Sequence, residues 1–171
     1  MKKILIIISV LLLSGCDLLG KETIETKLNP GFDIINAGEI HEDTGCIILI
    51  DNEEFDMEVS SNNVNEDILG EYLITYSYQY EEIEYSCSRY VKVIDDISPV
   101  VSLNMGIDTI IVTEDFTDAG VTYSDNYDTE LEVVINGEVD TSVVGRYVIT
   151  YQVTDNSSNT TEVVRIVNVI D

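Results

Sequence analysis

The sequence of 171 residues predicts an all-β protein made of two similar β-sandwich units. In residues 145–153, GRYVITYQV, apolar or aromatic side chains occupy every second position, as in a half-buried antiparallel strand. A weaker copy, GEYLITYSY, occupies residues 70–78. Val, Ile, Thr and Tyr are frequent and Trp is absent, a composition that favours strands over helices.

The two copies belong to a longer internal repeat. The sequence aligns with itself at a constant offset that places Gly31 on Gly106 and Tyr76 on Tyr151. After the following loop the offset grows by a single position, which aligns Arg89 with Arg165. Such a small change fits a hairpin loop, because loops tolerate insertions. We therefore expect two tandem domains, 28–95 and 96–171, joined by a short segment that ends at Pro99.

Six short strands are expected in the second domain, with a turn signal about every 8–12 residues, which is typical of a β-sandwich. Asn136-Gly137 is the dipeptide that suits a two-residue type I′ turn after the fourth of them. Arg165, like Arg89, interrupts the apolar phase of its strand and is expected either to pair with a carboxylate or to be solvated at the strand end. The expected strands are 100–103, 110–112, 121–123, 131–135, 146–153 and 161–169.

The amino terminus has the three parts of an export signal. Lys2 and Lys3 precede an apolar run, residues 4–13, which is shorter than the roughly 20 residues of a membrane-spanning helix. Residues 13–16, Leu-Ser-Gly-Cys, resemble the lipobox of bacterial lipoproteins. The resemblance implies a signal peptide over 1–15 and a lipidated Cys16 that anchors the chain on the extracytoplasmic face of the cell membrane. Residues 16–27 are then the lipidated cysteine and its tether; the alternative is an ordinary signal peptide with a chance cysteine.

Motifs of the second domain resemble the bacterial Ig-like domain of some pesticidal crystal proteins and of many surface proteins, which is related in style to hyalin repeats. The resemblance implies two Ig-like β-sandwiches, of which 28–95 is a diverged copy. It also implies that Tyr72 and Tyr147, each two residues after a glycine, form structural tyrosine corners. Ser158 stands where family members more often have glycine. The motifs are Asp96-x-x-Pro99, residues 116–121 (FTDAGV), Gly145-Arg146-Tyr147-x-x-x-Tyr151, residues 155–159 and Arg165-x-Val167-x-Val169.

Cys46 and Cys87 remain as a pair if Cys16 carries lipid. Their counterparts in the second domain are Val121 and Val163, so both cysteines are expected to face the core. An even pair in an exported chain favours a disulfide. Two buried free thiols are the alternative, because cysteine also packs as a small apolar residue.

Acidic residues gather in three segments that could supply oxygen ligands to calcium, the one cofactor that the sequence suggests. No EF-hand pattern is present, and clusters also arise by chance among 33 acidic residues. The candidate ligands are Asp95, Asp96, Asp125, Asp128 and Asp155.

The formal charge of −25 argues against nucleic acid as a partner, because phosphates would be repelled. No catalytic motif accompanies the one histidine, His41, so we expect no enzyme.

We expect a surface-anchored binding, adhesion or spacer module with an unknown protein or glycan ligand. It is expected to act through parts that the two copies do not share, chiefly 39–64 and the loop 125–128. The alternatives are a carbohydrate-binding module and a small hydrolase. Aromatic candidates for a glycan platform are Tyr78, Tyr80, Tyr85 and Tyr90, of which only Tyr90 is clearly out of phase with the core.

Overall fold

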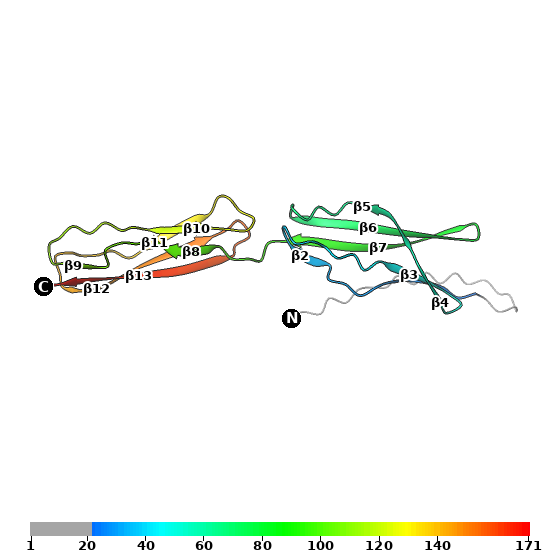
Figure 1. Cartoon of the computed structure of the whole chain (residues 1–171), viewed down its shortest axis with the longest axis horizontal. Coiled ribbons are helices and arrows are strands. Elements are labelled where there is room, and N and C mark those ends of the chain that lie inside the picture. The colour runs from blue at the N-terminus through cyan, green and yellow to red at the C-terminus, as the bar shows by residue number, and fades with distance from the viewer. Residues whose placement is uncertain (1–21) are drawn as a thin grey trace. The chain divides into compact units, whose positions relative to one another are not determined.

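The computed structural model describes residues 22–171, and within them every regular element is a strand (Figure 1). The all-β prediction is therefore confirmed. The described residues divide into two compact units. The first comprises 22–35, 40–65 and 70–92, and the second comprises 36–39, 66–69 and 93–171. No helix in this part of the chain has the length and hydropathy that a membrane crossing requires.

The first unit contains two sheets, with strand orders β1-β3-β4 and β2-β7-β6-β5. Strand β1 pairs antiparallel with β3, so part of the segment 16–27 that we had assigned to a tether belongs to a sheet of the first unit. That part of the prediction is wrong because Glu25 and Lys27, which suggested a polar linker, alternate with half-buried Ile24, Thr26 and Leu28. The strands are β1 Ile24–Leu28, β2 Ile34–Asn36, β3 Cys46–Ile50, β4 Glu53–Asp56, β5 Glu58–Asn62, β6 Gly70–Tyr80 and β7 Ile83–Ile94.

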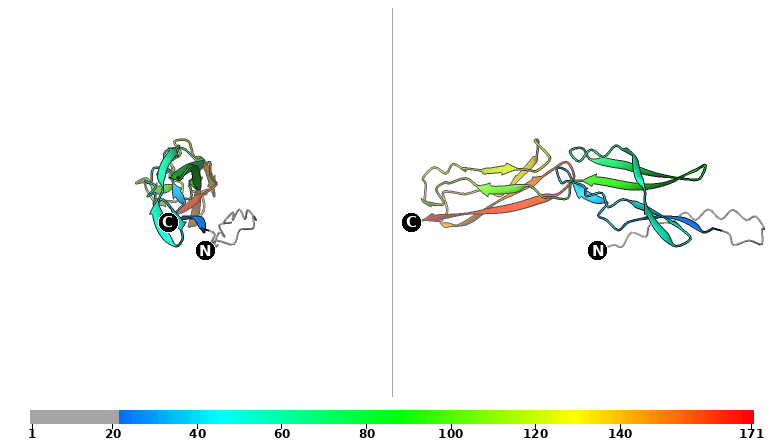
Figure 2. Two further views of the ribbon diagram at one scale, coloured as in Figure 1. Left: turned by 90° about the vertical axis from the view of Figure 1, so that its right-hand side faces the viewer. Right: turned by 45° about the vertical axis from the view of Figure 1, so that its right-hand side comes forward.

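The second unit has the same arrangement without an equivalent of β4 (Figure 2). Its sheets have the orders β10-β8 and β11-β12-β13-β9, and β9 runs parallel to β13. At the offset of the internal repeat, each of these strands falls on a strand of the first unit. All six strand predictions are confirmed to within one residue at each end. The strands are β8 Val100–Leu103, β9 Thr109–Ile111, β10 Val121–Ser124, β11 Glu132–Asn136, β12 Gly145–Thr154 and β13 Thr160–Ile170.

The two-residue turn predicted at Asn136-Gly137 is wrong. Asn136 is still in β11, opposite Thr150, and residues 137–144 connect it to β12. Gly137 has φ +104, and a Cβ there would lie 2.1 Å from the Val148 carbonyl oxygen, so close backbone approach explains the glycine. A two-residue turn occurs instead at Asp51 and Asn52, both with positive φ, between β3 and β4.

Each unit has its own core between its two sheets. In β12 the buried residues Ile149, Tyr151 and Val153 alternate with more exposed ones, as the period of two predicts. The second core also contains Val167 and the partly buried Val121 and Val163. In the first unit the corresponding places hold Cys46 and Cys87, which a disulfide joins between the two sheets.

Candidate functional site

Four of the five aspartates proposed as ligands lie together in the second unit. Asp95 follows β7, Asp125 and Asp128 lie between β10 and β11, and Asp155 follows β12. One carboxylate oxygen from each lies within 4.8 Å of those from the others. Asp95 and Asp155 are only 8% and 6% exposed. The fifth candidate, Asp96, is exposed and outside the group.

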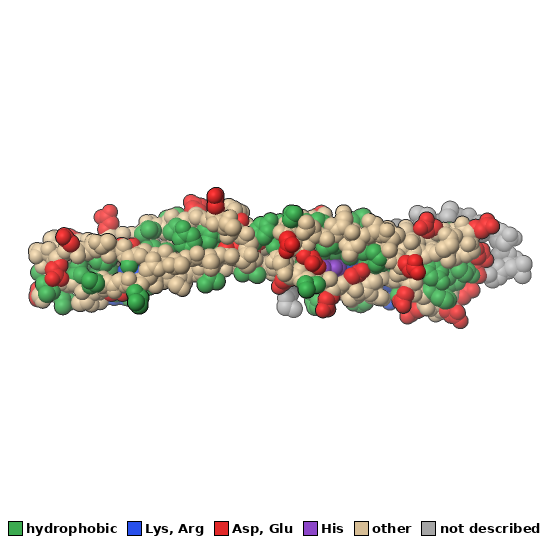
Figure 3. Space-filling view, turned by 45° about the horizontal axis from the view of Figure 1, so that its top comes forward, with side chains coloured by type: hydrophobic (Ala, Val, Ile, Leu, Met, Phe, Trp, Pro, Cys, Tyr) green, Lys and Arg blue, Asp and Glu red, His purple; other side chains and the backbone are tan. Residues whose placement is uncertain are grey.

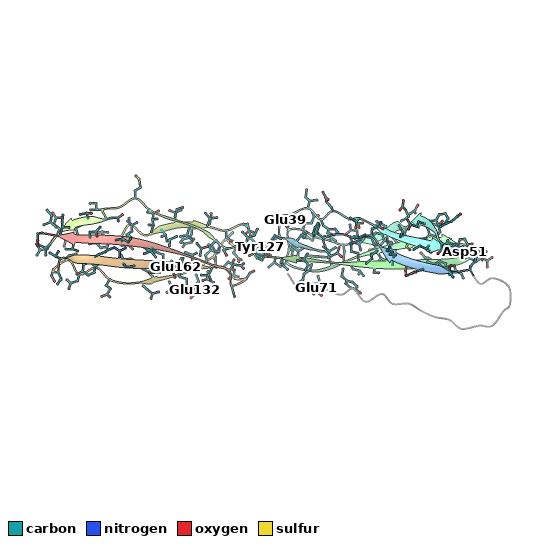
Figure 4. All side chains as sticks on the ribbon, turned by 90° about the horizontal axis from the view of Figure 1, so that it is seen from below. Glu39, Asp51, Glu71, Tyr127, Glu132 and Glu162 are labelled. Carbon is teal, nitrogen blue, oxygen red and sulfur yellow. A yellow bond between two sulfur atoms is a disulfide. The ribbon has the colours of Figure 1, made fainter. Side chains whose placement is uncertain are left out.

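Hydrogen bonds from the backbone shape the loops that carry these aspartates. Asp125 Oδ1 accepts from the backbone N–H groups of Tyr127 and Asp128, at 2.9 and 3.0 Å. Asp155 accepts from the backbone and side chain of Asn159, at 2.7 and 2.8 Å. Such Asx turns are a property of short polar loops and do not by themselves indicate a ligand. Figure 4 labels Tyr127, which marks the loop at one end of the second unit.

A second set of hydrogen bonds joins the loops to one another. The backbone and side-chain nitrogens of Asn156 donate to Asp128 Oδ2 and Oδ1, at 2.9 and 2.7 Å. The Asn159 side chain donates to the Asp95 carbonyl oxygen at 3.3 Å. The positions of the carboxylates are therefore fixed by the loops and not only by the strands.

Two carboxylate oxygens of the group are buried without a hydrogen-bond partner, Asp95 Oδ2 and Asp125 Oδ2. The salt bridges found among residues 22–171 involve other carboxylates, so no Lys or Arg of this part of the chain neutralises the four aspartates. Buried carboxylates that share a site repel one another and lose hydration. The arrangement thus has the donor set and the charge of a site for a hard cation.

Arg89 lies at the centre of a different buried cluster, in the first unit, and is only 1% exposed. Its Nη1 donates to Asp33 Oδ1 at 2.6 Å, and its Nη2 donates to the carbonyl oxygens of Asn29 and Gly45 at 2.7 and 3.0 Å. Tyr76 donates its hydroxyl proton to Asp43 Oδ1, which lies 3.6 Å from Arg89 Nε. Burial and the bond to Asp43 raise the pKa of Tyr76 to about 12.

Arg165 has the corresponding partners in the second unit and is 2% exposed. It donates to Asp108 Oδ1 at 2.6 Å and to the carbonyl oxygens of Asn104 and Gly120 at 2.6 and 3.3 Å. Tyr151 donates to Asp118, and burial together with that bond raises the pKa of Tyr151. Burial is the largest single influence and lowers the pKa of Arg165, but the hydrogen bonds and charges of Asp108 and Tyr151 together outweigh it, so the net shift is upward. Of the two expectations for these arginines, pairing with a carboxylate is correct.

The carboxylate partners of the arginines were not predicted as functional residues. The internal repeat contained the signal, because its offset aligns Asp33 with Asp108 and Asp43 with Asp118. Both arginines donate to groups of their own unit, so their role is structural.

Tyr147 is structural as well, since its hydroxyl donates to the Val143 carbonyl oxygen at 2.9 Å, as in a tyrosine corner. In both units the tyrosine ring of this motif, Tyr72 or Tyr147, lies beside the preceding glycine.

The remaining candidates lie in the first unit. The His41 side chain is 3% exposed, and its Nε2 is 3.8 Å from Asp33 Oδ1, beside the Arg89 cluster.

A pocket of about 470 Å³ is lined by Phe55, Tyr78 and Tyr80 together with Glu22, Ile50, Asp51 and Glu53. Tyr80 donates to Glu22 Oε1 at 2.9 Å, and this bond raises the pKa of Tyr80 to about 12. Tyr90 is 72% exposed and lies outside the lining of that pocket.

Residues 106–169 match the family described as "Bacterial surface protein, Ig-like domain". The matched segment lies within the second unit and includes Arg165 with its carboxylate partners Asp108 and Asp118, and three of the four aspartates. This match supports an Ig-like surface protein, in agreement with the resemblance drawn from the motifs. A search of curated proteins finds no match to this chain.

Proposed function

We propose that this chain is a lipid-anchored, non-catalytic surface module that presents two Ig-like units for binding or adhesion, or as a spacer. The match of residues 106–169 to a bacterial surface Ig-like domain carries the proposal, because it agrees with the export signal read from residues 1–16. The anchor itself, Cys16, lies outside the described residues. Acyl chains at this position would hold the units close to the extracytoplasmic face of the membrane.

The interior of each unit supports a scaffold role. The most deeply buried polar side chains are Arg89 and Arg165. Both donate hydrogen bonds to carbonyl and carboxylate groups of their own unit. His41 is packed beside Asp33, which also accepts a hydrogen bond from Arg89. Figure 3 displays Asp and Glu side chains across the visible face of both units, a charge distribution that favours solubility.

Anchoring is tested by replacing the cysteine that would carry the lipid. In a bacterial host, the wild-type chain should sediment with membranes and incorporate labelled palmitate. Protease added to spheroplasts should degrade it, because the chain would lie on the extracytoplasmic face. Cys16→Ser should lose the label and the membrane association. Cys87→Ser is the matched control, since it removes a cysteine of the folded part and should keep the label. A wild-type chain that carries no label and stays in the soluble fraction would contradict the proposal.

A carbohydrate-binding role is the second candidate, and the pocket of the first unit is the observation that favours it. Aromatic rings combined with carboxylates suit sugar rings and their hydroxyls, and Phe55 and Tyr78 lie with ring centroids 5.8 Å apart. A glycan array probed with the full chain tests this role. Any signal should fall in Tyr78→Ala and persist in Tyr90→Ala, which changes an exposed tyrosine outside the pocket lining. A signal that both variants retain would place glycan binding elsewhere.

A further inference from the structure

We propose that Asp95, Asp125, Asp128 and Asp155 bind one calcium ion. The first ground is convergence. Four carboxylate oxygens from three separate segments lie within 4.8 Å of one another. Calcium binds oxygen ligands at about 2.3–2.6 Å, so two ligands on opposite sides of the ion are separated by roughly 4.8 Å. The group therefore has the dimensions of a calcium coordination shell.

The second ground is independent of acidity and concerns unused hydrogen-bonding capacity. Asp95 is more than nine-tenths buried, and its Oδ2 has no hydrogen-bond partner. Asp125 is only partly buried as a residue, but its Oδ2 atom is likewise buried without a hydrogen-bond partner. Each of these two residues uses its Oδ1 on backbone N–H groups, which leaves the second oxygen available for another ligand. A buried, unpaired carboxylate oxygen is costly, and a cation is the ligand that relieves the cost at several oxygens at once.

The chemistry of the group favours calcium over other cations. The ligands are all hard oxygen donors, without the histidine or cysteine that zinc and copper prefer. Calcium takes six to eight oxygens, so the four carboxylates would be completed by carbonyl oxygens, bidentate contacts or water. Magnesium requires about 2.1 Å and near-octahedral geometry, which loops held by their own hydrogen bonds would have to contract to provide.

The consequence of binding is local to the second unit. An ion at this place would join the segment that enters the unit, at Asp95, to the β10–β11 loop and to the loop after β12. In the absence of an ion, the same four carboxylates repel one another. We therefore expect the unit to be more stable with calcium than without it, since a ligand of the native state stabilises by mass action.

The test uses the full chain in a mild non-ionic detergent, stripped with chelator, with salt held at about 150 mM to screen diffuse binding. Thermal unfolding is followed by circular dichroism in chelator, in about 5 mM CaCl₂ and in about 5 mM MgCl₂, several-fold above the dissociation constants typical of extracellular calcium modules. Calcium should raise the unfolding midpoint by roughly 5 °C, and magnesium should raise it less. Calorimetric titration should give one ion per chain.

Two variants separate the site from the acidic surface. Asp125→Asn keeps an oxygen for the Asx turn but loses a charge, so it should abolish the calcium-dependent rise and unfold no lower than wild type in chelator. Asp140→Asn is the matched control, because Asp140 caps an exposed loop of the same unit through Ser142, outside the group. It should keep the full rise. Equal midpoints for wild type in calcium and chelator, an unchanged rise in Asp125→Asn, or equal effects of magnesium and calcium would each overturn the proposal. All three outcomes leave the anchoring proposal untouched, since that depends on Cys16.

Discussion

Replacement of Arg165 by Met should destabilise the second unit by about 3–4 kcal/mol. The variant keeps an apolar side chain of similar length, so the loss comes mainly from the guanidinium group. The carbonyl oxygens of Asn104 and Gly120 each lose one hydrogen bond at roughly 1 kcal/mol, and Gly120 keeps a second one from the Asn104 backbone N–H. The Asp118 carboxylate, 28% exposed, loses its cation and adds about 1–2 kcal/mol. Asp108 is 50% exposed and contributes little, because water replaces the guanidinium there.

Urea and thermal unfolding of the full chain, followed by circular dichroism, measure this loss. For a unit of this size it corresponds to a fall in midpoint of roughly 15–25 °C. Arg146→Met is the matched control, because Arg146 is exposed on the neighbouring strand β12 and its replacement should change stability by less than about 0.5 kcal/mol. Arg165→Lys should recover only part of the loss, since an ammonium group cannot reproduce the planar set of donors. A loss below about 1 kcal/mol in Arg165→Met would refute the view that this arginine ties the unit together.

Three further predictions concern the same interiors. Because the pKa of Tyr76 rises from 10.0 to about 12 on folding, its contribution to stability should be complete below pH 10 and lost between pH 10 and 12; urea midpoints across this range should fall less in Tyr76→Phe than in wild type. The double variant Cys46→Val/Cys87→Val removes a cross-link over 41 residues and should cost up to about 4 kcal/mol, with a free-thiol assay of the denatured wild-type chain returning no signal from these two cysteines. Gly106→Ala should lower the thermal midpoint measurably, since its Cβ would lie 2.9 Å from Ala119 Cβ and 3.0 Å from Arg165 Nη1; a midpoint equal to that of wild type would mean that the Arg165 cluster adjusts without cost.

The strands could be predicted because their information is local. In β12 and β13 a period of two is enough to assign each residue to the core or to the surface, and the internal repeat then transfers the assignment to β6 and β7. Strand β1 was missed although its burial alternates, because charged residues at every second position look the same in a tether and in a half-exposed strand. Local pattern does not distinguish these cases; pairing with β3 does.

Tertiary proximity accounts for the rest of what the sequence left open. The glycine at 137 allows the close approach of the Val148 carbonyl oxygen rather than a two-residue turn, and that approach brings the residue after β11 against β12. The aspartates were proposed because acidic residues gather in three segments of the sequence, and only the fold separates Asp95, which belongs to the group, from its neighbour Asp96, which does not. The carboxylates that hold Arg89 and Arg165 are equally remote, since 56 and 57 residues separate these arginines from Asp33 and Asp108.

The first unit provides an internal comparison for the aspartate group. At the offset of the repeat, Asp125, Asp128 and Asp155 correspond to Ile50, Glu53 and Tyr80. Those three residues line the pocket of the first unit, where Glu53 is exposed and the Tyr80 hydroxyl is hydrogen-bonded to Glu22.

An aliphatic side chain and a phenol thus occupy two of the places that hold aspartates in the second unit, and the one acid that is kept, Glu53, faces solvent. Because the first unit folds without carboxylates at the places of Asp125 and Asp155, the requirements of the fold do not explain why the second unit concentrates buried charge there. The cation that we propose would explain it, because it would neutralise the carboxylates and use the oxygens that lack hydrogen-bond partners.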